Sequence, residues 1–212
     1  MAHTVWIARH GNRQDFVDPD WPNTAERPYD PGLSPDGIVQ ARQLAERMES
    51  EHISAIFASP FLRAVETAYQ IAELLDLPIF IEPGMSEWFN PEWFPAAPQT
   101  MPSDLLVERF PRVDPTYSSK IRPRYPETED NAMRRSAEAA HAIAESFPEP
   151  VLLVGHGVSV AGATVGLDPD AVIRECGLCC LFKIVRQSDR WQMELCADVS
   201  HLDEVGAENR FN

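Results

Sequence analysis

Residue types that bind and transfer phosphoryl groups follow several strand-like segments of the sequence. Arg9-His10-Gly11 comes directly after the first segment, Arg63 follows the second, Glu87 lies a few residues beyond the third, and His156-Gly157 follows the fourth. Each signal is weak alone, because an Arg-His-Gly triplet also arises by chance. In an α/β sheet, however, ligands bind beyond the carboxyl ends of the strands. We therefore expect these residues to meet at one edge of one sheet.

The elements that must position these residues alternate between strands and helices, which predicts a sheet covered by helices on both faces. The expected strands are Val5–Ala8, Ile53–Ala58, Pro78–Ile81, Val151–Val154, Leu178–Val185 and Trp191–Val199, the last two forming a hairpin. The expected helices run from the cap Ser34-Pro35 to Met48, from Ser59-Pro60 to Leu75, and from Thr128 to Ser146. A polar, proline-rich loop is expected before Leu33. This pattern predicts an α/β three-layer sandwich with a mixed, mostly parallel sheet, in one domain spanning residues 1–212.

The segment 88–126 breaks this alternation. It is rich in proline and carries Trp88, Phe89, Trp93 and Phe94, but it has no sustained periodicity. Tryptophan and phenylalanine are rare in disordered linkers, so we expect an ordered insertion that covers the site. We call residues 88–126 the cap segment. Its aromatic side chains either line a hydrophobic substrate pocket or anchor the cap segment itself.

The motifs and their order resemble the histidine phosphatase, or phosphoglycerate mutase-like, superfamily. The matching segments are Ala8-Arg9-His10-Gly11, Ser59-Pro60-Phe61-Leu62-Arg63-Ala64, Glu87 and Val154-Gly155-His156-Gly157. Within the superfamily, the stretch from Glu82 to Trp88 and the arginine at Arg13 are most similar to the phosphatase domains of the suppressors of T-cell receptor signalling. Those domains differ at Gly11, where this chain keeps the superfamily glycine, whose small size would let a phosphate approach the backbone.

The resemblance implies hydrolysis of a phosphomonoester through a phosphohistidine on His10, without a metal ion or other cofactor. Arg9, Arg13 and Arg63 would neutralise the phosphate oxygens and disfavour protonation of His10. His156 would bind the phosphate from the opposite side. The expected phosphate-binding residues are Arg9, Arg13, Arg63, His156, Asn12 and Gly157. Asn12 and Ser59 fit the capping of turns equally well.

A carboxyl group must protonate the leaving oxygen and later take a proton from the attacking water. We prefer Glu87 for this role, because it falls in the loop above the sheet. Glu82, on the strand side of Pro83-Gly84, is the main alternative, and Glu92 is a weaker one. Glu127 resembles a carboxylate that the family places before its long helix, but we favour a role in stabilising the helix N-terminus.

Composition limits the partners. The chain has a net charge of −15, which argues against nucleic acid. Its apolar runs are too short for a bilayer and its N-terminus lacks the features of a signal peptide, so we expect a cytoplasmic protein without membrane partners. A local arginine cluster can still hold a small-molecule or peptide phosphomonoester, because charges are screened beyond about 8 Å in physiological salt.

The four cysteines, Cys176, Cys179, Cys180 and Cys196, are expected to be core thiols rather than metal or redox sites.

Two other functions stay open. One is a phosphoglycerate mutase, ranked lower because those enzymes have longer chains and a different sequence around the acid. The other is a catalytically silent phosphate-binding or scaffold protein, against which the complete set of His10, Glu87, His156 and three arginines argues. The identity of the phosphomonoester and the oligomeric state are not specified by the sequence.

Overall fold

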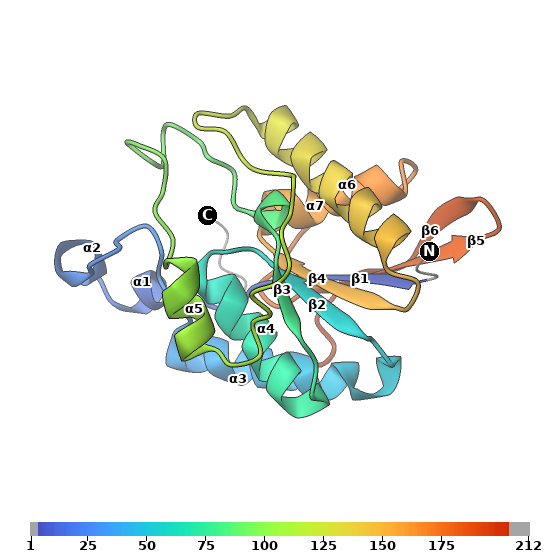
Figure 1. Cartoon of the computed structure of the whole chain (residues 1–212), viewed down its shortest axis with the longest axis horizontal. Helices are drawn as coiled ribbons and strands as arrows, with labels where there is room; N and C mark the ends of the chain where they lie inside the picture. Colours follow the sequence, from blue (N-terminus) through green and yellow to red (C-terminus); the bar gives the residue numbers. More distant parts are fainter. Residues whose placement is uncertain (1–3, 204–212) are drawn as a thin grey trace.

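The computed structural model describes residues 4–203 and is built on a six-stranded mixed sheet (Figure 1). The strand order is β3-β2-β4-β1-β5-β6. The strands are β1 (Thr4–Arg9), β2 (Ala55–Ala58), β3 (Ile79–Ile81), β4 (Val151–Gly155), β5 (Leu181–Gln187) and β6 (Arg190–Asp198). Strands β1 to β4 pair in parallel, whereas β5 pairs antiparallel with both β1 and β6. The prediction of a mixed, mostly parallel sheet ending in a hairpin is confirmed.

Helices cover both faces of the sheet, as expected (Figure 1). Helices α3 (Pro35–Met48) and α4 (Leu62–Leu75) pack on one face, and α6 (Glu129–Ser146) and α7 (Gly157–Leu167) pack on the other. In β1 the side chains alternate between the two cores, with Trp6 and Ala8 in the first and Val5 and Ile7 in the second. The three-layer α/β architecture follows from this alternation.

Two of the three predicted helix caps are confirmed. The side-chain oxygens of Ser34 and Thr128 each accept a hydrogen bond from the backbone N–H three residues further along, at the starts of α3 and α6. The prediction for Ser59 was wrong, because α4 begins at Leu62 with Phe61 at its N-cap. The hydroxyl of Ser59 has another partner, described below.

The proline-rich stretches contain more regular structure than expected. The loop before Leu33 holds two short helices, α1 (Gln14–Val17) and α2 (Trp21–Thr24). The cap segment is ordered and contains α5 (Ser103–Arg109), which its irregular pattern did not reveal. Single 3₁₀ turns, η1 (Glu49–Glu51) and η2 (Pro83–Met85), follow α3 and β3. No helix within residues 4–203 combines the length and the hydropathy needed to cross a membrane.

The cysteines were predicted correctly only in part. Cys179 and Cys180 are fully buried in opposite cores, although they precede β5 instead of lying in it. Cys176 is half-buried, and Cys196 is exposed on β6, so the expectation of a core thiol was wrong there.

Candidate active site

His10 lies at the carboxyl end of β1 and is completely buried. Its backbone N–H donates to the carbonyl of Gly155 (3.0 Å), which ties the end of β1 to the end of β4. Its Nδ1 lies 2.7 Å from the carbonyl oxygen of Gly11. Because that oxygen can only accept, Nδ1 carries the ring proton and Nε2 keeps its lone pair. Burial and the charges of Arg63 and Arg9 also hold the pKa of His10 well below its ordinary value. The imidazole is therefore neutral, with Nε2 available as a nucleophile.

Arg63 connects the nucleophile to the carboxylate. It lies in the first turn of α4, as predicted, and is 1% exposed. Its Nε donates to Nε2 of His10 (3.3 Å), and its Nη2 donates to Oε2 of Glu87 (3.2 Å). Burial lowers the pKa of Arg63 to about 10, so the guanidinium stays charged at neutral pH. This charge lies beside both His10 and Glu87.

Glu87 and His156 face each other across the site. Nδ1 of His156 lies 3.4 Å from Oε2 of Glu87, and its Nε2 lies 2.8 Å from the hydroxyl of Ser59. Burial lowers the pKa of His156 to about 4, so the ring is neutral and its Nδ1–H can point into the site. Burial alone would raise the pKa of Glu87, but His156, Arg63 and the N–H of Trp88 outweigh it and hold that pKa well below its usual value. Glu87 is therefore ionised while no phosphate is bound.

Three buried donors on residues that influence His10 electrostatically have no hydrogen-bond partner among residues 4–203. They are Nε of Arg9, Nη1 of Arg63 and Nδ1 of His156. The Arg9 side chain is held in place because its Nη1 donates to the carbonyl of Cys176 (2.6 Å). Unsatisfied buried donors are rare because each one costs free energy. A phosphate group supplies several acceptor oxygens, so these donors mark the position at which it can bind beside Nε2 of His10.

The remaining phosphate-binding candidates are less directly placed. Arg13 pairs with Asp15 and stacks on the ring of Phe16 (4.4 Å), at the mouth of the cavity that leads to Arg63. Gly157 is the first residue of α7, where the free backbone N–H groups of the helix begin. The side-chain amide of Asn12 donates to Asp36 in the first turn of α3, so this amide already has a hydrogen-bond partner within the protein.

Gly11 has a structural reason for being glycine. A Cβ at this position would lie 2.7 Å from the backbone oxygen of Gly37 in α3. The small residue therefore serves the contact between the loop after β1 and α3, and the approach of phosphate to its backbone stays a prediction.

The two alternative carboxylates lie elsewhere. Glu82 is buried, but its oxygens accept hydrogen bonds from the N–H of Gly84 (2.6 Å), the hydroxyl of Tyr117 (2.6 Å) and the hydroxyl of Ser119 (2.7 Å). Glu92 is exposed on the cap segment. Glu87 is thus the carboxylate that the structure brings to His10, Arg63, Arg9 and His156.

Sequence reasoning missed Arg135, which holds the loop that carries Glu87. Its guanidinium donates to both oxygens of Glu127 (3.0 and 2.8 Å) and to the carbonyls of Gly84 (2.7 Å), Ser86 (3.2 Å) and Glu87 (3.1 Å). Glu127 is therefore an ion-pair partner of Arg135, and the role at the helix N-terminus that we favoured stays a prediction. No local pattern reveals that Arg135 holds this loop, since the carbonyls it binds lie 48 to 51 residues away along the chain.

His10, Glu87 and His156 also have the composition of a possible metal site, since their ligand atoms lie within 4.8 Å of one another. The charge of the surroundings opposes a cation, because Arg63 contacts two of the three residues. The same charge favours an anion.

Comparison with known proteins decides the family. The model of the histidine phosphatase superfamily (branch 1) matches residues 5–199. The chain belongs to this superfamily. Curated members that it resembles include the 55 kDa subunit of transcription factor tau from Saccharomyces cerevisiae, with 32% identity over 75% of this chain and 39% of that protein. Human ubiquitin-associated and SH3 domain-containing protein A is 34% identical over 70% of this chain and 24% of that protein. This histidine phosphatase domain thus spans well under half the length of these relatives.

Solved structures of histidine phosphatases share the fold. The ecdysone phosphate phosphatase of Bombix mori superposes with a TM-score of 0.78 and 23% identity, covering 99% of this chain and 98% of that one. The argument from the sequence that phosphoglycerate mutases have longer chains was wrong. The "Probable phosphoglycerate mutase GpmB" of Photorhabdus laumondii is 28% identical over 94% of both chains, so length does not separate this protein from mutases.

Proposed function

We propose that this histidine phosphatase hydrolyses phosphomonoesters through a phosphohistidine on His10 and without a metal ion. The observation that carries the proposal is a buried, neutral imidazole whose Nε2 lone pair faces Nε of Arg63 (3.3 Å), next to further donors of Arg9, Arg63 and His156 that have no hydrogen-bond partner among the described residues. We also propose a cytoplasmic location and small-molecule or peptide substrates, with no role for nucleic acid or membranes.

In the first step, Nε2 of His10 attacks phosphorus while the bond to the ester oxygen breaks. The donors of Arg9, Arg63 and His156 stabilise the phosphate oxygens, which is the main requirement of phosphoryl transfer. The electron pair of the broken bond stays on the leaving oxygen, which takes a proton from Glu87. In the second step, water loses a proton to Glu87 and attacks phosphorus, and the bond to Nε2 breaks.

Glu87 is ionised in the free protein, so it must gain a proton when the substrate binds. A phosphate dianion places negative charge beside Glu87 and takes over the donors of Arg63. Both effects raise the pKa of Glu87, because they remove the interactions that stabilised its charged form. Substrate binding thereby converts Glu87 from a carboxylate into the acid that the first step needs.

The cavity above the site has the character of a leaving-group pocket. It has a volume of about 400 Å³ and combines Arg13, Arg63 and Glu87 with an apolar wall. That wall consists of Pro22, Pro28, Tyr29, Trp93 and Phe94. Of the two roles open for the cap-segment aromatics, the pocket role fits Trp93 and Phe94, whereas Trp88 anchors the segment by donating to the carbonyl of Glu127 (2.8 Å). We propose that a flat or aromatic leaving group binds against Trp93 and Tyr29.

Trp93→Ala should raise KM for naphthyl phosphate by about fivefold, because stacking contributes about 1 kcal/mol beyond the buried area. KM for glycerol phosphate, which has no ring to stack, should change little. Steady-state kinetics with both esters measure the difference. Trp191→Ala, which removes the same side chain far away on β6, is the matched control. A similar increase for both esters would contradict the assignment of this pocket.

Hydrolysis should persist in excess EDTA, since arginines provide the charge neutralisation that metal ions provide in other phosphatases. Added Zn²⁺ should inhibit, because a cation held by His10, Glu87 and His156 would occupy the lone pair of the nucleophile. Phosphate release measured with chelator and then with excess Zn²⁺ tests both statements. Loss of activity in EDTA that a divalent ion restores would overturn the metal-independent mechanism.

A panel of phosphate esters tests the proposed reaction as a whole, with formation of 2-phosphoglycerate from 3-phosphoglycerate measured alongside. Release of inorganic phosphate supports the hydrolase, and interconversion of the two phosphoglycerates would identify a mutase. Tight phosphate binding without either reaction would identify a silent binding protein.

A further inference from the structure

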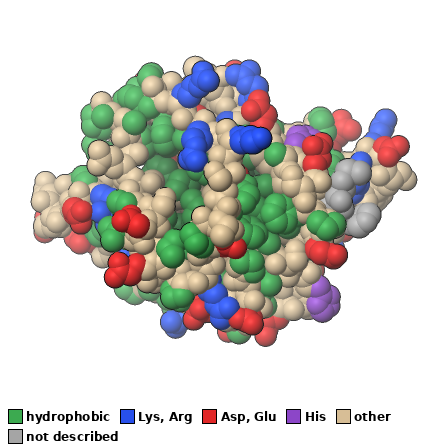
Figure 2. Space-filling model, in the orientation of Figure 1, with side chains coloured by type: hydrophobic (Ala, Val, Ile, Leu, Met, Phe, Trp, Pro, Cys, Tyr) green, Lys and Arg blue, Asp and Glu red, His purple; other side chains and the backbone are tan. Residues whose placement is uncertain are grey.

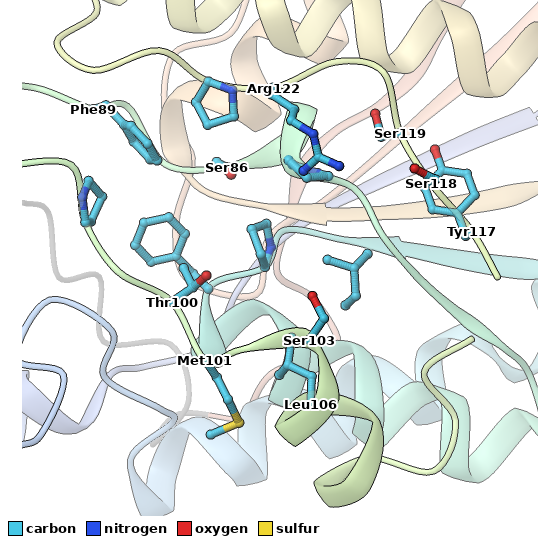
Figure 3. Close-up of a pocket in the computed structure, with 16 residues that line it drawn as sticks. Ser86, Phe89, Thr100, Met101, Ser103, Leu106, Tyr117, Ser118, Ser119 and Arg122 are labelled. Atoms are coloured by element: carbon cyan, nitrogen blue, oxygen red, sulfur yellow. The ribbon is translucent and has the colours of Figure 1, made fainter. Parts of the chain in front are cut away.

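A second hollow lies beside the active site and shares none of its polar residues (Figure 3). Its volume is about 370 Å³, within the range of small-molecule sites. It is enclosed by the loops after β2 and β3 and by two parts of the cap segment, residues 98–106 and 117–123. His10, Arg63, Glu87 and His156 do not line it, so the phosphate-binding residues do not account for it.

The walls of the hollow combine apolar side chains, such as Phe61 and Phe89, with hydroxyl groups and Arg122, and two of these polar groups lack partners within residues 4–203. The hydroxyl of Ser86, at the back, is completely buried and has no hydrogen-bond partner. Arg122 extends its guanidinium over the hollow (Figure 3), and no hydrogen bond or ion pair engages it within residues 4–203. Because buried hydroxyl groups are rarely left without a hydrogen-bond partner, we infer that a ligand supplies one here.

The charge around the hollow selects an anion. No aspartate or glutamate lines it, although the chain as a whole has a net charge of −15. The nearby Glu82 lies behind Tyr117 and Ser119 and accepts hydrogen bonds from both. Lysine and arginine side chains gather over this side of the molecule (Figure 2). Lys120, Arg124 and Arg134 line a neighbouring hollow together with Arg122. Two glutamates also line that hollow, Glu127, which pairs with Arg135, and Glu138, so positive charge is in excess there. An anionic group at the rim would therefore be attracted.

The hollow is joined to the active site through Phe61 and Ser86. The Phe61 ring lies edge-on to the ring of His156, with centroids 5.2 Å apart, and the Arg63 guanidinium lies 4.7 Å from its centroid. Ser86 directly precedes Glu87, and its carbonyl accepts from Arg135. A ligand in the hollow would therefore contact residues that hold the acid and two phosphate-binding side chains in place.

We propose that this hollow is a second binding site, for a hydroxylated aromatic carboxylate. Its apolar body packs against Phe61 and Phe89, its carboxylate pairs with Arg122, and its hydroxyl bonds to Ser86. Occupancy changes the turnover at His10. The proposed binding is argued from the residues that line the hollow, and only the effect on turnover rests on the proposed phosphatase activity.

The test uses 6-hydroxy-2-naphthoate as the probe and isothermal titration calorimetry on the full chain. Saturable binding should persist in the presence of saturating inorganic phosphate, because the two sites are separate. Arg122→Gln and Ser86→Ala should each weaken binding by about tenfold, the size of one hydrogen bond to a charged or buried partner. Arg124→Gln, an exposed arginine two positions away that does not line the hollow, should bind as the wild type does.

Turnover provides the second readout. Saturating probe should change kcat for nitrophenyl phosphate by about fivefold or more without competing with it, and Arg122→Gln should abolish that change at the same probe concentration. Displacement of the probe by phosphate, the absence of saturable binding, or equal behaviour of Arg122→Gln and Arg124→Gln would overturn the site. Binding without any change in kcat would overturn the coupling. A chain that binds the probe as expected but hydrolyses no ester would contradict only the proposed function.

Discussion

His10→Ala is expected to abolish both hydrolysis and the formation of the proposed phosphoenzyme. The reason is geometric, since Nε2 of His10 is the one nucleophilic atom that the described residues place among the unpaired donors of Arg9, Arg63 and His156. Rapid quenching after mixing with a ³²P-labelled ester should trap an acid-labile label on the wild type and none on the variant. The expected loss of kcat is several orders of magnitude, because the covalent route no longer exists.

Two controls keep this result interpretable. His141→Ala removes an exposed histidine on α6 and should leave labelling and turnover unchanged. The His10→Ala variant should still bind inorganic phosphate through the arginines, and its thermal unfolding shows whether the buried cavity has damaged the fold. Acid-labile label that survives in a folded His10→Ala variant would remove His10 from its role.

Glu87→Gln should slow phosphoryl transfer in proportion to how much the leaving group needs a proton. An alkyl phosphate leaves as a strongly basic alkoxide, so the burst rate with it should fall by roughly 10²–10⁴-fold, the usual range for general acid catalysis. A nitrophenyl phosphate leaves as a stable anion, and its burst rate should fall much less. Burst kinetics are needed because, in the proposed mechanism, Glu87 would also activate water in the second step, and steady-state rates would include that step.

Glu82→Gln is the matched control for this experiment. Both glutamates are buried, but Glu82 binds Gly84, Tyr117 and Ser119 instead of the phosphate site. Its loss should disturb the loop and affect the two esters equally. If Glu87→Gln also slows both esters equally, Glu87 is not the acid. A leaving-group dependence in Glu82→Gln would transfer the role to Glu82.

The fold and the position of most site residues could be predicted from local sequence patterns. Apolar runs of strand length placed His10 after β1 and His156 after β4, and the parallel pairing of these strands brings both to one edge. Ser34 and Thr128 marked the starts of α3 and α6 because their side chains cap N–H groups only three residues away. Where the local pattern was irregular, prediction failed, as for α5 within the cap segment.

The partners of individual polar groups were decided by the tertiary structure. Glu82 and Glu87 lie five residues apart and are equally acidic in sequence, yet Tyr117 and Ser119 engage one, while Arg63 and His156 flank the other. Ser59 was expected to cap a helix, but it binds His156 from a strand end 97 residues earlier. These partners meet only after the sheet has formed.

The sequence by itself determined the three-layer α/β fold and the places of His10 and the arginines at the ends of its elements, because these depend on periodicity within one element and on the order of the elements. The tertiary structure decided which carboxylate serves the site, why Gly11 is a glycine, and how Arg135 holds the loop of Glu87. It also decided the state of His10, whose neutral ring and unprotonated Nε2 result from complete burial beside Arg63 and from the carbonyl of Gly11. A side chain's protonation and its hydrogen-bond partners depend on distances between atoms that are remote in sequence, and only the packed chain sets those distances.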